Sequence, residues 1–339
     1  MTNAWGALRR RILTPSFTET KLATRGFHEK SPAAKELLET VGESFLTGYA
    51  CAAEARSPVA AEERLEEIPP QFRGFAYEGA AMAFTVRDRL PIGRSGNFAR
   101  FLAGRGDAHI YMAYVGVGWG MARLPRFRWP SLHTTDPLLR WLALDGYGFH
   151  QAYFHTDRYI YEQFRNTRVW WPAEPQWYAA RAIDQGIGRA LWFVGGTDVD
   201  LVATMIDKFP AQRRADLYSG AGLAATYAGG ADEEELRMFW RRAGDYRPHV
   251  AQGSAFAAEA RIRAGLVVPH TGVATSVFCG MTPEQAAQVT HELRPETAAR
   301  PGQTDHSEHS ELRESAPPAF EVWRQRIAEK FASIGGVGT

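Results

Sequence analysis

The sequence predicts an all-α fold, a superhelical stack of about seven two-helix repeats of roughly 34 residues, similar to a tetratricopeptide-like α-solenoid. The main observation is a set of seven pairs of small residues, each a glycine followed four positions later by Gly or Ala, whose first glycines are 31 to 38 residues apart. A second observation is that strand-like patterns are scarce along the chain. The pairs are Gly48/Ala52, Gly79/Ala83, Gly116/Gly120, Gly148/Ala152, Gly186/Ala190, Gly220/Ala224 and Gly253/Ala257.

The small pairs also predict how the helices pack. Residues four positions apart lie on one helix face, so a pair of small residues allows a second helix to approach closely. Each pair therefore indicates one Gly/Ala-rich helix that packs tightly against a neighbour.

Residues 200–232 show the order of elements within one repeat most clearly. Segment 200–209 has its apolar residues on one face of a short helix, and Pro210 stops or restarts the helix. A Gly/Ala-rich helix follows at about 215–227, Gly229-Gly230 ends it, and Asp232 caps the next helix. The same order is found in 32–55, 58–86, 97–123, 136–153 and 283–293.

An internal duplication is superimposed on this repeat. Segment 68–83 matches segment 209–224 at a constant offset of 141 residues. Segment 110–115 is the best strand candidate, but its counterpart 250–260 has a helical pattern, so we predict helix for both. The offset pairs Pro69 with Pro210, Gln71 with Gln212, Arg73 with Arg214, Tyr77 with Tyr218, and Gly79 with Gly220.

Composition divides the chain into three parts. Residues 1–293 form the all-α repeat domain. Residues 294–318 are rich in Pro, Glu, Thr, Ser and His, which predicts a disordered linker. Residues 319–339 form a C-terminal helix and tail, and apolar residues at 320, 323, 327 and 331 give this helix an amphipathic face.

Charge and composition limit the function classes. The 339-residue chain is 45% hydrophobic and has a formal net charge of +1, so no bulk electrostatic argument favours nucleic acid. Cys51 and Cys279 form no disulfide framework or zinc cluster, which is typical of a reducing compartment. The chain contains no apolar run of about 18 residues, so no transmembrane segment is predicted. No signal peptide is evident either, and we therefore expect a cytoplasmic protein. The basic, amphipathic segment 4–13 either touches a membrane surface peripherally or packs on the end of the solenoid.

The segment 145–157 contains the best candidates for proton transfer. His150 is the expected acid–base, with Asp145 or Asp157 orienting it, and His155 lies close in sequence. No metal site is predicted, because a five-residue spacing does not place both imidazoles on one helix face. The alternative is a structural role in which the histidines hydrogen-bond a helix end.

Glu78 is a further catalytic candidate, because it directly precedes Gly79. We call Gly79 and the equivalent glycines of the other pairs seam glycines, since neighbouring helices are expected to pack closely at them. A carboxyl group at a tightly packed seam must be hydrogen-bonded, or its pKa rises. If several such carboxyl groups converge, they could perform general acid–base work. The alternative is structural ion pairs, for which Arg73 and Arg214 are the expected partners.

Segment 154–177 interrupts the repeat and is dense in aromatic residues. It either lines a groove for a flat, conjugated, apolar ligand or fills a gap between the duplicated halves. Glycine-rich runs at 116–120 and 186–188 do not indicate a dinucleotide site, since no βαβ pattern surrounds them; the cofactor is unknown. The candidate substrate-binding residues are Tyr153, Phe154, Tyr159, Trp170, Trp171 and Trp177.

Four long strings, at 73–83, 144–157, 184–193 and 250–260, resemble the UnbL family, an actinobacterial domain-of-unknown-function family encoded in enediyne antibiotic gene clusters. The resemblance covers roughly residues 5–295. It implies a place beside the iterative enediyne polyketide synthase, its thioesterase, UnbV and UnbU, in the conversion of a linear polyene into the enediyne core. The family supplies no catalytic residues to carry over.

We therefore expect an accessory protein of enediyne antibiotic biosynthesis that acts on, or holds, the linear polyene. The alternative is a non-catalytic helical-repeat scaffold that binds partner proteins of the polyketide pathway. An enclosed cavity with convergent carboxylates and histidines would favour the first function. An open concave face with a charged stripe would favour the second.

Overall fold

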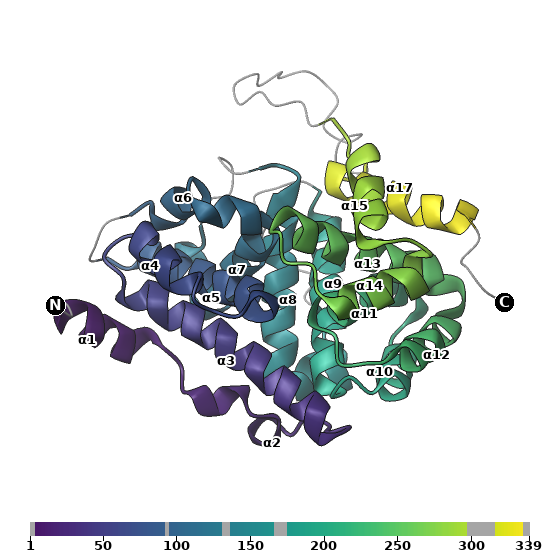
Figure 1. The fold of residues 1–339 in the computed structure, drawn as a ribbon, viewed down its shortest axis with the longest axis horizontal. Coiled ribbons are helices and arrows are strands. Elements are labelled where there is room, and N and C mark those ends of the chain that lie inside the picture. The colour runs from purple at the N-terminus through teal and green to yellow at the C-terminus, as the bar shows by residue number, and fades with distance from the viewer. Residues whose placement is uncertain (1–3, 92–94, 131–135, 166–174, 297–315, 335–339) are drawn as a thin grey trace.

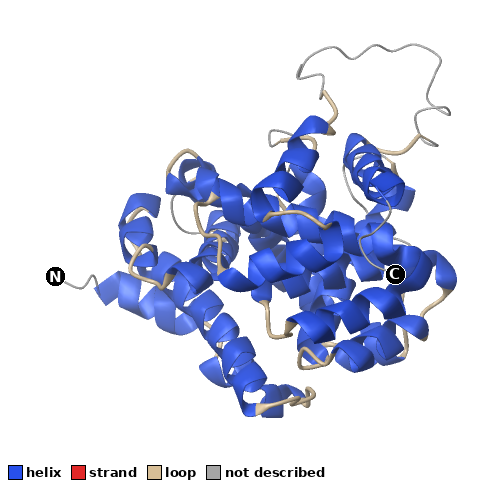
Figure 2. Cartoon of the chain, turned by 45° about the vertical axis from the view of Figure 1, so that its right-hand side comes forward, coloured by secondary structure: helices blue, strands red, loops and turns tan. Residues whose placement is uncertain are grey.

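The computed structural model describes residues 4–91, 95–130, 136–165, 175–296 and 316–334. Over these residues the chain is helical, with connecting turns and no strand (Figure 2). The predicted all-α class is confirmed, and both segments of the strand candidate pair are helical.

Seven long Gly/Ala-rich helices form an inner layer, and each packs mainly against the next one in the chain (Figure 1). This succession confirms the predicted helical-repeat stack. The helices are α3 (Pro32–Glu54), α5 (Pro70–Arg89), α7 (Ile110–Arg123), α8 (Leu142–Phe154), α9 (Gln176–Val194), α11 (Ala211–Ala228) and α13 (Arg247–Arg263).

Shorter helices form an outer layer at both ends of the stack. In the part of the outer layer that covers α7, α8 and α9, the described residues form only short turns, such as the π-helical turn Asp157–Tyr161. The two-helix repeat is thus regular at the ends and reduced in the middle. The outer helices are α4 (Pro58–Leu65), α6 (Asn97–Leu102), α10 (Val199–Asp207), α12 (Glu233–Ala243), α14 (Pro269–Cys279) and α15 (Pro283–Glu292).

The seam glycines allow direct backbone contact between the long helices. A Cβ atom added to Gly79 would lie 1.9 Å from the carbonyl oxygen of Phe45, and one added to Gly220 would lie 2.0 Å from that of Gln185. No side chain fits at such a distance, so close approach requires glycine at these positions.

Several long helices carry a second glycine two positions after the first, and it serves the opposite neighbour. In α9, Gly186 faces the carbonyl of Asp145 on α8, whereas Gly188 faces that of Leu217 on α11. Two residues advance about 200° around a helix, so the two glycines point to opposite sides. The Gly-x-Gly runs are therefore helix-packing devices.

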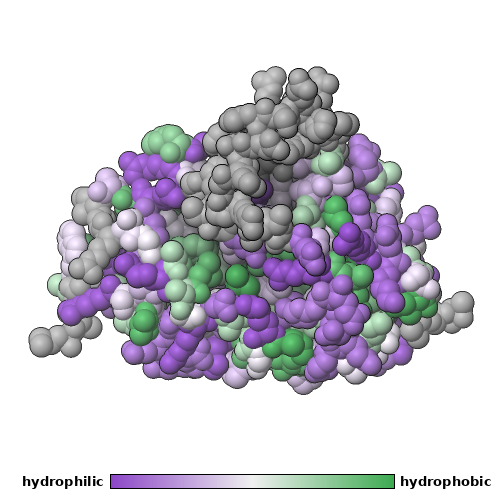
Figure 3. Space-filling view, turned by 90° about the horizontal axis from the view of Figure 1, so that it is seen from above, coloured by the Kyte–Doolittle hydropathy of each residue, from purple (hydrophilic) through white to green (hydrophobic). Residues whose placement is uncertain are grey.

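The inner layer curves until its last helix, α13, reaches α5 and α7. The Tyr111 hydroxyl on α7 donates to Glu259 on α13 at 3.1 Å. Arg261 on α13 donates to the backbone carbonyl of Gln71 on α5 at 3.1 Å. These contacts close the concave side of the stack around an interior. On the face in Figure 3, hydrophobic residues appear only in separate clusters among hydrophilic ones.

The duplicated segments share one bracing arrangement, which corrects the expected pairing of Arg73 and Arg214. Each guanidinium donates to backbone carbonyls five and seven residues earlier, at the end of the preceding helix, and not to the carboxylates before the seam glycines. Arg73 donates to Ile68 at 3.2 Å and Glu66 at 2.8 Å, and Arg214 to Phe209 at 2.7 Å and Asp207 at 2.6 Å.

The C-terminal helix α17 (Ala319–Ile334) packs on α13 and α15. Its Trp323 is buried, and the indole donates to the carbonyl of Thr290 at 2.8 Å. Most of the predicted linker, residues 297–315, lies outside the described residues. Just before it, Arg294 forms an ion pair with Asp136 at 3.1 Å.

The N-terminal helix α1 (Ala4–Leu13) lies along the C-terminal end of α3. Gly6 packs on the backbone of Glu54, and Arg9 donates to the carbonyl of Ala55 at 2.8 Å. The other face exposes Trp5 and Ile12, at 65% and 70% of their surface. None of the described helices has the length and apolar content needed to cross a membrane.

Candidate functional site

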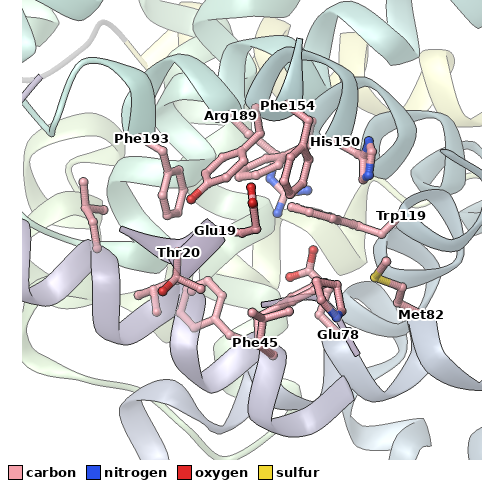
Figure 4. Close-up of a pocket in the computed structure, with 18 of the residues that line it drawn as sticks. Glu19, Thr20, Phe45, Glu78, Met82, Trp119, His150, Phe154, Arg189 and Phe193 are labelled. Carbon is pink, nitrogen blue, oxygen red and sulfur yellow. The ribbon is translucent and has the colours of Figure 1, made fainter. Parts of the chain in front are cut away.

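The interior of the stack contains a cavity between α3, α5, α7, α8 and α9, which we call the main cavity (Figure 4). Pro15, Glu19 and Thr20 of the N-terminal segment border it. The space between the lining residues is about 730 Å³ when the part open to solvent is included, and about 80 Å³ of it admits the centre of a water molecule. The close packing of these five helices determines where the cavity lies, because the inner face of each helix contributes to its wall.

Aromatic rings make up much of the cavity wall, and Trp119 of α7 lies among them. Its indole centroid lies 4.6 Å from the ring of Phe45, 5.2 Å from Phe149 and 5.3 Å from His150. Such a wall suits a flat, apolar ligand, because aromatic faces and edges pack favourably on conjugated systems. The aromatic lining residues are Phe45, Phe75, Trp119, Phe149, Tyr153, Phe154 and Phe193.

Glu78 of α5 is the acidic group buried in this apolar wall. Burial raises the pKa of its carboxyl to about 7; the charge of Arg189 opposes the rise and that of Asp145 adds to it. A carboxyl group with a pKa near 7 is well matched to exchanging a proton at neutral pH.

Arg189 of α9 faces the same cavity and links it to a second, smaller one. Its Nη1 donates to Oδ1 of Asp145, and both residues border the second cavity beside Tyr227. Burial lowers the pKa of Arg189, but the charges of Asp145 and Glu78 outweigh burial and raise the pKa above its ordinary value. The guanidinium therefore stays charged between two acidic groups.

His150 of α8 borders the main cavity with a neutral imidazole. Burial, aided by the charges of Arg123, His155 and Arg25, lowers the pKa of His150 to about 3. Its Nδ1 is buried and has no hydrogen-bond partner within the described chain. At neutral pH His150 can therefore orient or bind a ligand, whereas Glu78 is better matched to proton transfer. Its expected acid–base role stays a prediction.

The structure brings some of the sequence candidates together. Glu78, His150, Tyr153 and Phe154 all border the main cavity, and Asp145 lies behind Arg189. They come from two helices, α5 and α8. The convergence of Glu78 with the group around His150 depends on α7, against which both α5 and α8 pack.

The other candidates lie elsewhere. His155 and Asp157 are exposed at the end of α8. Tyr159 is buried against Phe164 at a ring distance of 5.5 Å, away from the cavity wall. Trp177 is 41% exposed and packs on Tyr178. Trp170 and Trp171 fall outside the described residues.

Sequence reasoning did not select Arg189 or Trp119. Both lie in Gly/Ala-rich helices, next to Gly188 and between Gly118 and Gly120 respectively. A large or charged residue adjoining two small ones in a seam helix cannot face the seam itself, so it must face the interior or the outer layer. That signal was available, and it could have identified both residues.

Comparison with known proteins identifies the family. A family model described as "Protein of unknown function (DUF1702)" matches residues 4–331. The chain belongs to the DUF1702 family. No curated protein and no solved structure matched this DUF1702 protein significantly. Within the described residues, no group of three or more His, Cys, Asp or Glu side chains could hold a metal ion.

Proposed function

We propose that this DUF1702 protein binds the linear polyene of enediyne antibiotic biosynthesis in the main cavity and holds or acts on it while the enediyne core forms. The observation that carries the proposal is an aromatic-lined cavity, partly open to solvent, into which Glu78 and Arg189 project. The pathway comes from the resemblance to the UnbL family, which also implies the polyketide synthase, UnbV and UnbU as partners.

The shape of the interior supports polyene binding over the scaffold alternative. A conjugated chain has a large apolar surface that is unfavourable in water, and enclosure by rings such as Trp119 and Phe149 removes that surface from solvent. A scaffold would use an open concave face, whereas here contacts such as Tyr111 with Glu259 close that side. Capture of a pathway protein without any polyene binding would favour the scaffold.

The test is quenching of tryptophan emission by a synthetic linear polyene, because Trp119 lies in the cavity wall. Phe154→Ala removes a ring from the wall and should weaken binding several-fold. The matched control is Phe164→Ala, which removes a similarly half-buried ring outside the cavity. Mass spectrometry after incubation, with and without pathway partners, shows whether the polyene is altered. Unchanged affinity in a folded Phe154→Ala variant would contradict the proposed cavity.

The Trp170/Trp171 pair is tested separately. If the aromatic insertion contributes to the site, Trp170→Ala combined with Trp171→Ala should weaken polyene binding without unfolding the protein. Unaltered affinity would assign the insertion a purely structural role.

We also infer that the protein is cytoplasmic and that α1 attaches it peripherally to membranes. Trp5, Leu8 and Ile12 form one exposed apolar face, and Arg11 flanks it, as in helices that lie in an anionic lipid interface. Sedimentation with phosphatidylcholine vesicles containing phosphatidylglycerol should fall on Trp5→Ser with Ile12→Ser. Phe127→Ser, which changes an aromatic residue that is 83% exposed elsewhere, is the control and should have no effect. Equal sedimentation of all variants would refute attachment through α1.

A further inference from the structure

Two polar side chains approach the main cavity from different helices. Glu78 projects from α5 and Arg189 from α9, and Figure 4 shows the carboxyl and the guanidinium on either side of the space between them. The ion-pair partner of Arg189 is Asp145, and Arg189 and Glu78 are not within ion-pair distance of each other. A guanidinium carries five N–H donors, and the hydrogen bond to Asp145 uses one of them.

The polar atoms behind Arg189 are also incompletely satisfied. Oδ2 of Asp145 and the hydroxyl of Tyr227 are buried, and neither has a hydrogen-bond partner among the described residues. Asp145 is 2% exposed and Tyr227 is 3% exposed. Buried polar groups are nearly always hydrogen-bonded in folded proteins. Both atoms border the smaller cavity behind Arg189, and neither accepts one of its remaining N–H groups, which therefore stay available to a ligand in the main cavity.

Charge decides which polar group fits. The groups that act electrostatically on Glu78 are Arg189 and Asp145, and Glu78 in turn acts on Tyr227. The walls contributed by α3 and α7 present Phe45 and Trp119 there. A ligand carboxylate would compete with Asp145 for the Arg189 guanidinium and would lose its hydration, and an ammonium would meet the guanidinium charge. A neutral oxygen acceptor avoids both costs.

The remaining ionisable groups around the cavity are Glu19, His150 and Arg123. Glu19 is bound by Arg25 at 2.8 Å, and His150 is neutral at neutral pH. Arg123 is exposed, so solvent screens its charge. None of them offsets the acidic groups deep in the cavity.

We propose that the main cavity recognises conjugated apolar molecules that carry a neutral carbonyl group, with the carbonyl oxygen bound between the Glu78 carboxyl and the Arg189 guanidinium. The oxygen has two lone pairs and accepts one hydrogen bond from each side chain. This inference rests on the proposed function, because it uses the same cavity and narrows its ligand to a carbonyl-bearing polyene.

Two hydrogen bonds have a spectroscopic consequence. Donors placed at a carbonyl oxygen draw electron density toward it, so a conjugated ketone bound there absorbs at longer wavelength than in an apolar solvent. The Glu78 donor exists only while its carboxyl is protonated. Both the affinity and the red shift should therefore decrease as the pH rises through about 7.

The experiment uses three linear conjugated tetraenes of equal length, ending in a methyl ketone, a carboxylate or a methyl group. Dissociation constants come from tryptophan quenching at pH 6 and pH 8.5, and the ketone absorption maximum is recorded in each complex. At pH 6 the ketone should bind about tenfold more tightly than the hydrocarbon, the gain expected from two hydrogen bonds. At pH 8.5 most of this preference should be lost.

Two variants at one position separate hydrogen bonding from packing. Glu78→Gln keeps an N–H donor that does not titrate, so it should bind the ketone with no pH dependence. Glu78→Leu removes this donor and keeps that of Arg189, so it should bind the ketone only about threefold more tightly than the hydrocarbon, with no pH dependence. Hydrocarbon binding by each variant shows that the cavity remains folded.

The outcomes distinguish this inference from the proposed function. Equal affinity of the wild-type protein for ketone and hydrocarbon, tighter binding of the carboxylate, or an absent red shift would each overturn carbonyl recognition and leave polyene binding intact. Failure of all three tetraenes to bind would overturn both.

Discussion

The duplicated units around α5 and α11 share a scaffold but differ inside. In both, an arginine and a tyrosine brace the end of the preceding helix, and a seam glycine contacts a backbone carbonyl. The same inner face carries Phe75 and Glu78 on α5, but Asp216 and Ser219 on α11. The first pair borders the main cavity, whereas in the second pair Asp216 faces the C-terminal helix and Ser219 faces α13.

The polar face of α11 is filled by the protein itself. Arg324 of α17 donates to Asp216 at 2.9 Å, and Arg181 of α9 donates to the same carboxylate at 2.9 Å. Ser219 hydrogen-bonds Gln252 at 2.7 Å. The difference on one helix face thus gives one copy a network that binds α17 and leaves the other copy bordering the main cavity.

The largest expected effect comes from breaking the network in the second copy. Asp216→Asn removes the charge that Arg181 and Arg324 share at a fully buried site, leaving Glu321 as their acidic partner. Unpairing a buried charge typically costs about 3–5 kcal/mol. Denaturation by urea should show a loss of that order in the free energy of unfolding. Phe75→Leu, the equivalent position in α5, is the control and should cost less; similar losses would mean that the two faces do not differ.

The second prediction concerns pH and the first copy. The pKa of Glu78 is raised from 4.5 to about 7, so between these values the folded state binds more protons than the unfolded state. Folding stability contributed by protonated Glu78 is therefore present at low pH and is lost as the pH rises through that window. Above pH 7 the penalty is on the order of 3 kcal/mol.

Glu78→Gln should remove this dependence. The variant should match the wild-type protein in unfolding free energy near pH 4 and exceed it at pH 8, by an amount on the order of 3 kcal/mol. Urea denaturation at a series of pH values measures the difference. A difference that stays constant with pH would show that Glu78 is ionised in the same range in both states.

Helix identity and the seams could be predicted from sequence because both depend on short-range spacing. Four-residue steps between small residues determine the face on which a neighbour packs, and Gly79 and Gly220 do contact backbone there. The occupants of the interior were harder to predict, because they depend on which helices meet across the stack. Asp145 pairs with Arg189, which is 44 residues away. Aromatic density alone selected Trp177, which is 41% exposed, and not Trp119, which is 8% exposed.

A third prediction tests the seams that the two copies share. Gly79→Ala and Gly220→Ala each place a methyl group against a backbone carbonyl, and overpacking of this kind typically costs about 1–3 kcal/mol or more. Substitution by leucine should cost more than substitution by alanine. Gly272→Ala in α14 is the control, because its added Cβ would have no neighbour within 4 Å and alanine favours helix. Thermal melts that rank Gly272→Ala with the seam variants would contradict close packing.

The smallest expected effect tests whether the two copies are braced equally. The Tyr77 hydroxyl donates to Glu66 at 2.6 Å, and the Tyr218 hydroxyl donates to Asp207 at 3.1 Å, at positions 141 residues apart. Tyr77→Phe and Tyr218→Phe each remove one hydrogen bond from a buried ring, so each should cost about 1 kcal/mol in urea denaturation.

The double variant of these tyrosines makes the comparison sharper. Each hydroxyl bonds within its own unit, to a residue 11 positions earlier, so the two sites share no partner. Effects at independent sites add to within about 0.5 kcal/mol. Tyr77→Phe with Tyr218→Phe should therefore cost about 2 kcal/mol in total. If the loss in the double variant differs from the sum of the two single losses, the two units are coupled through the stack. If only one of the single variants loses stability, the duplicated brace stabilises only that copy.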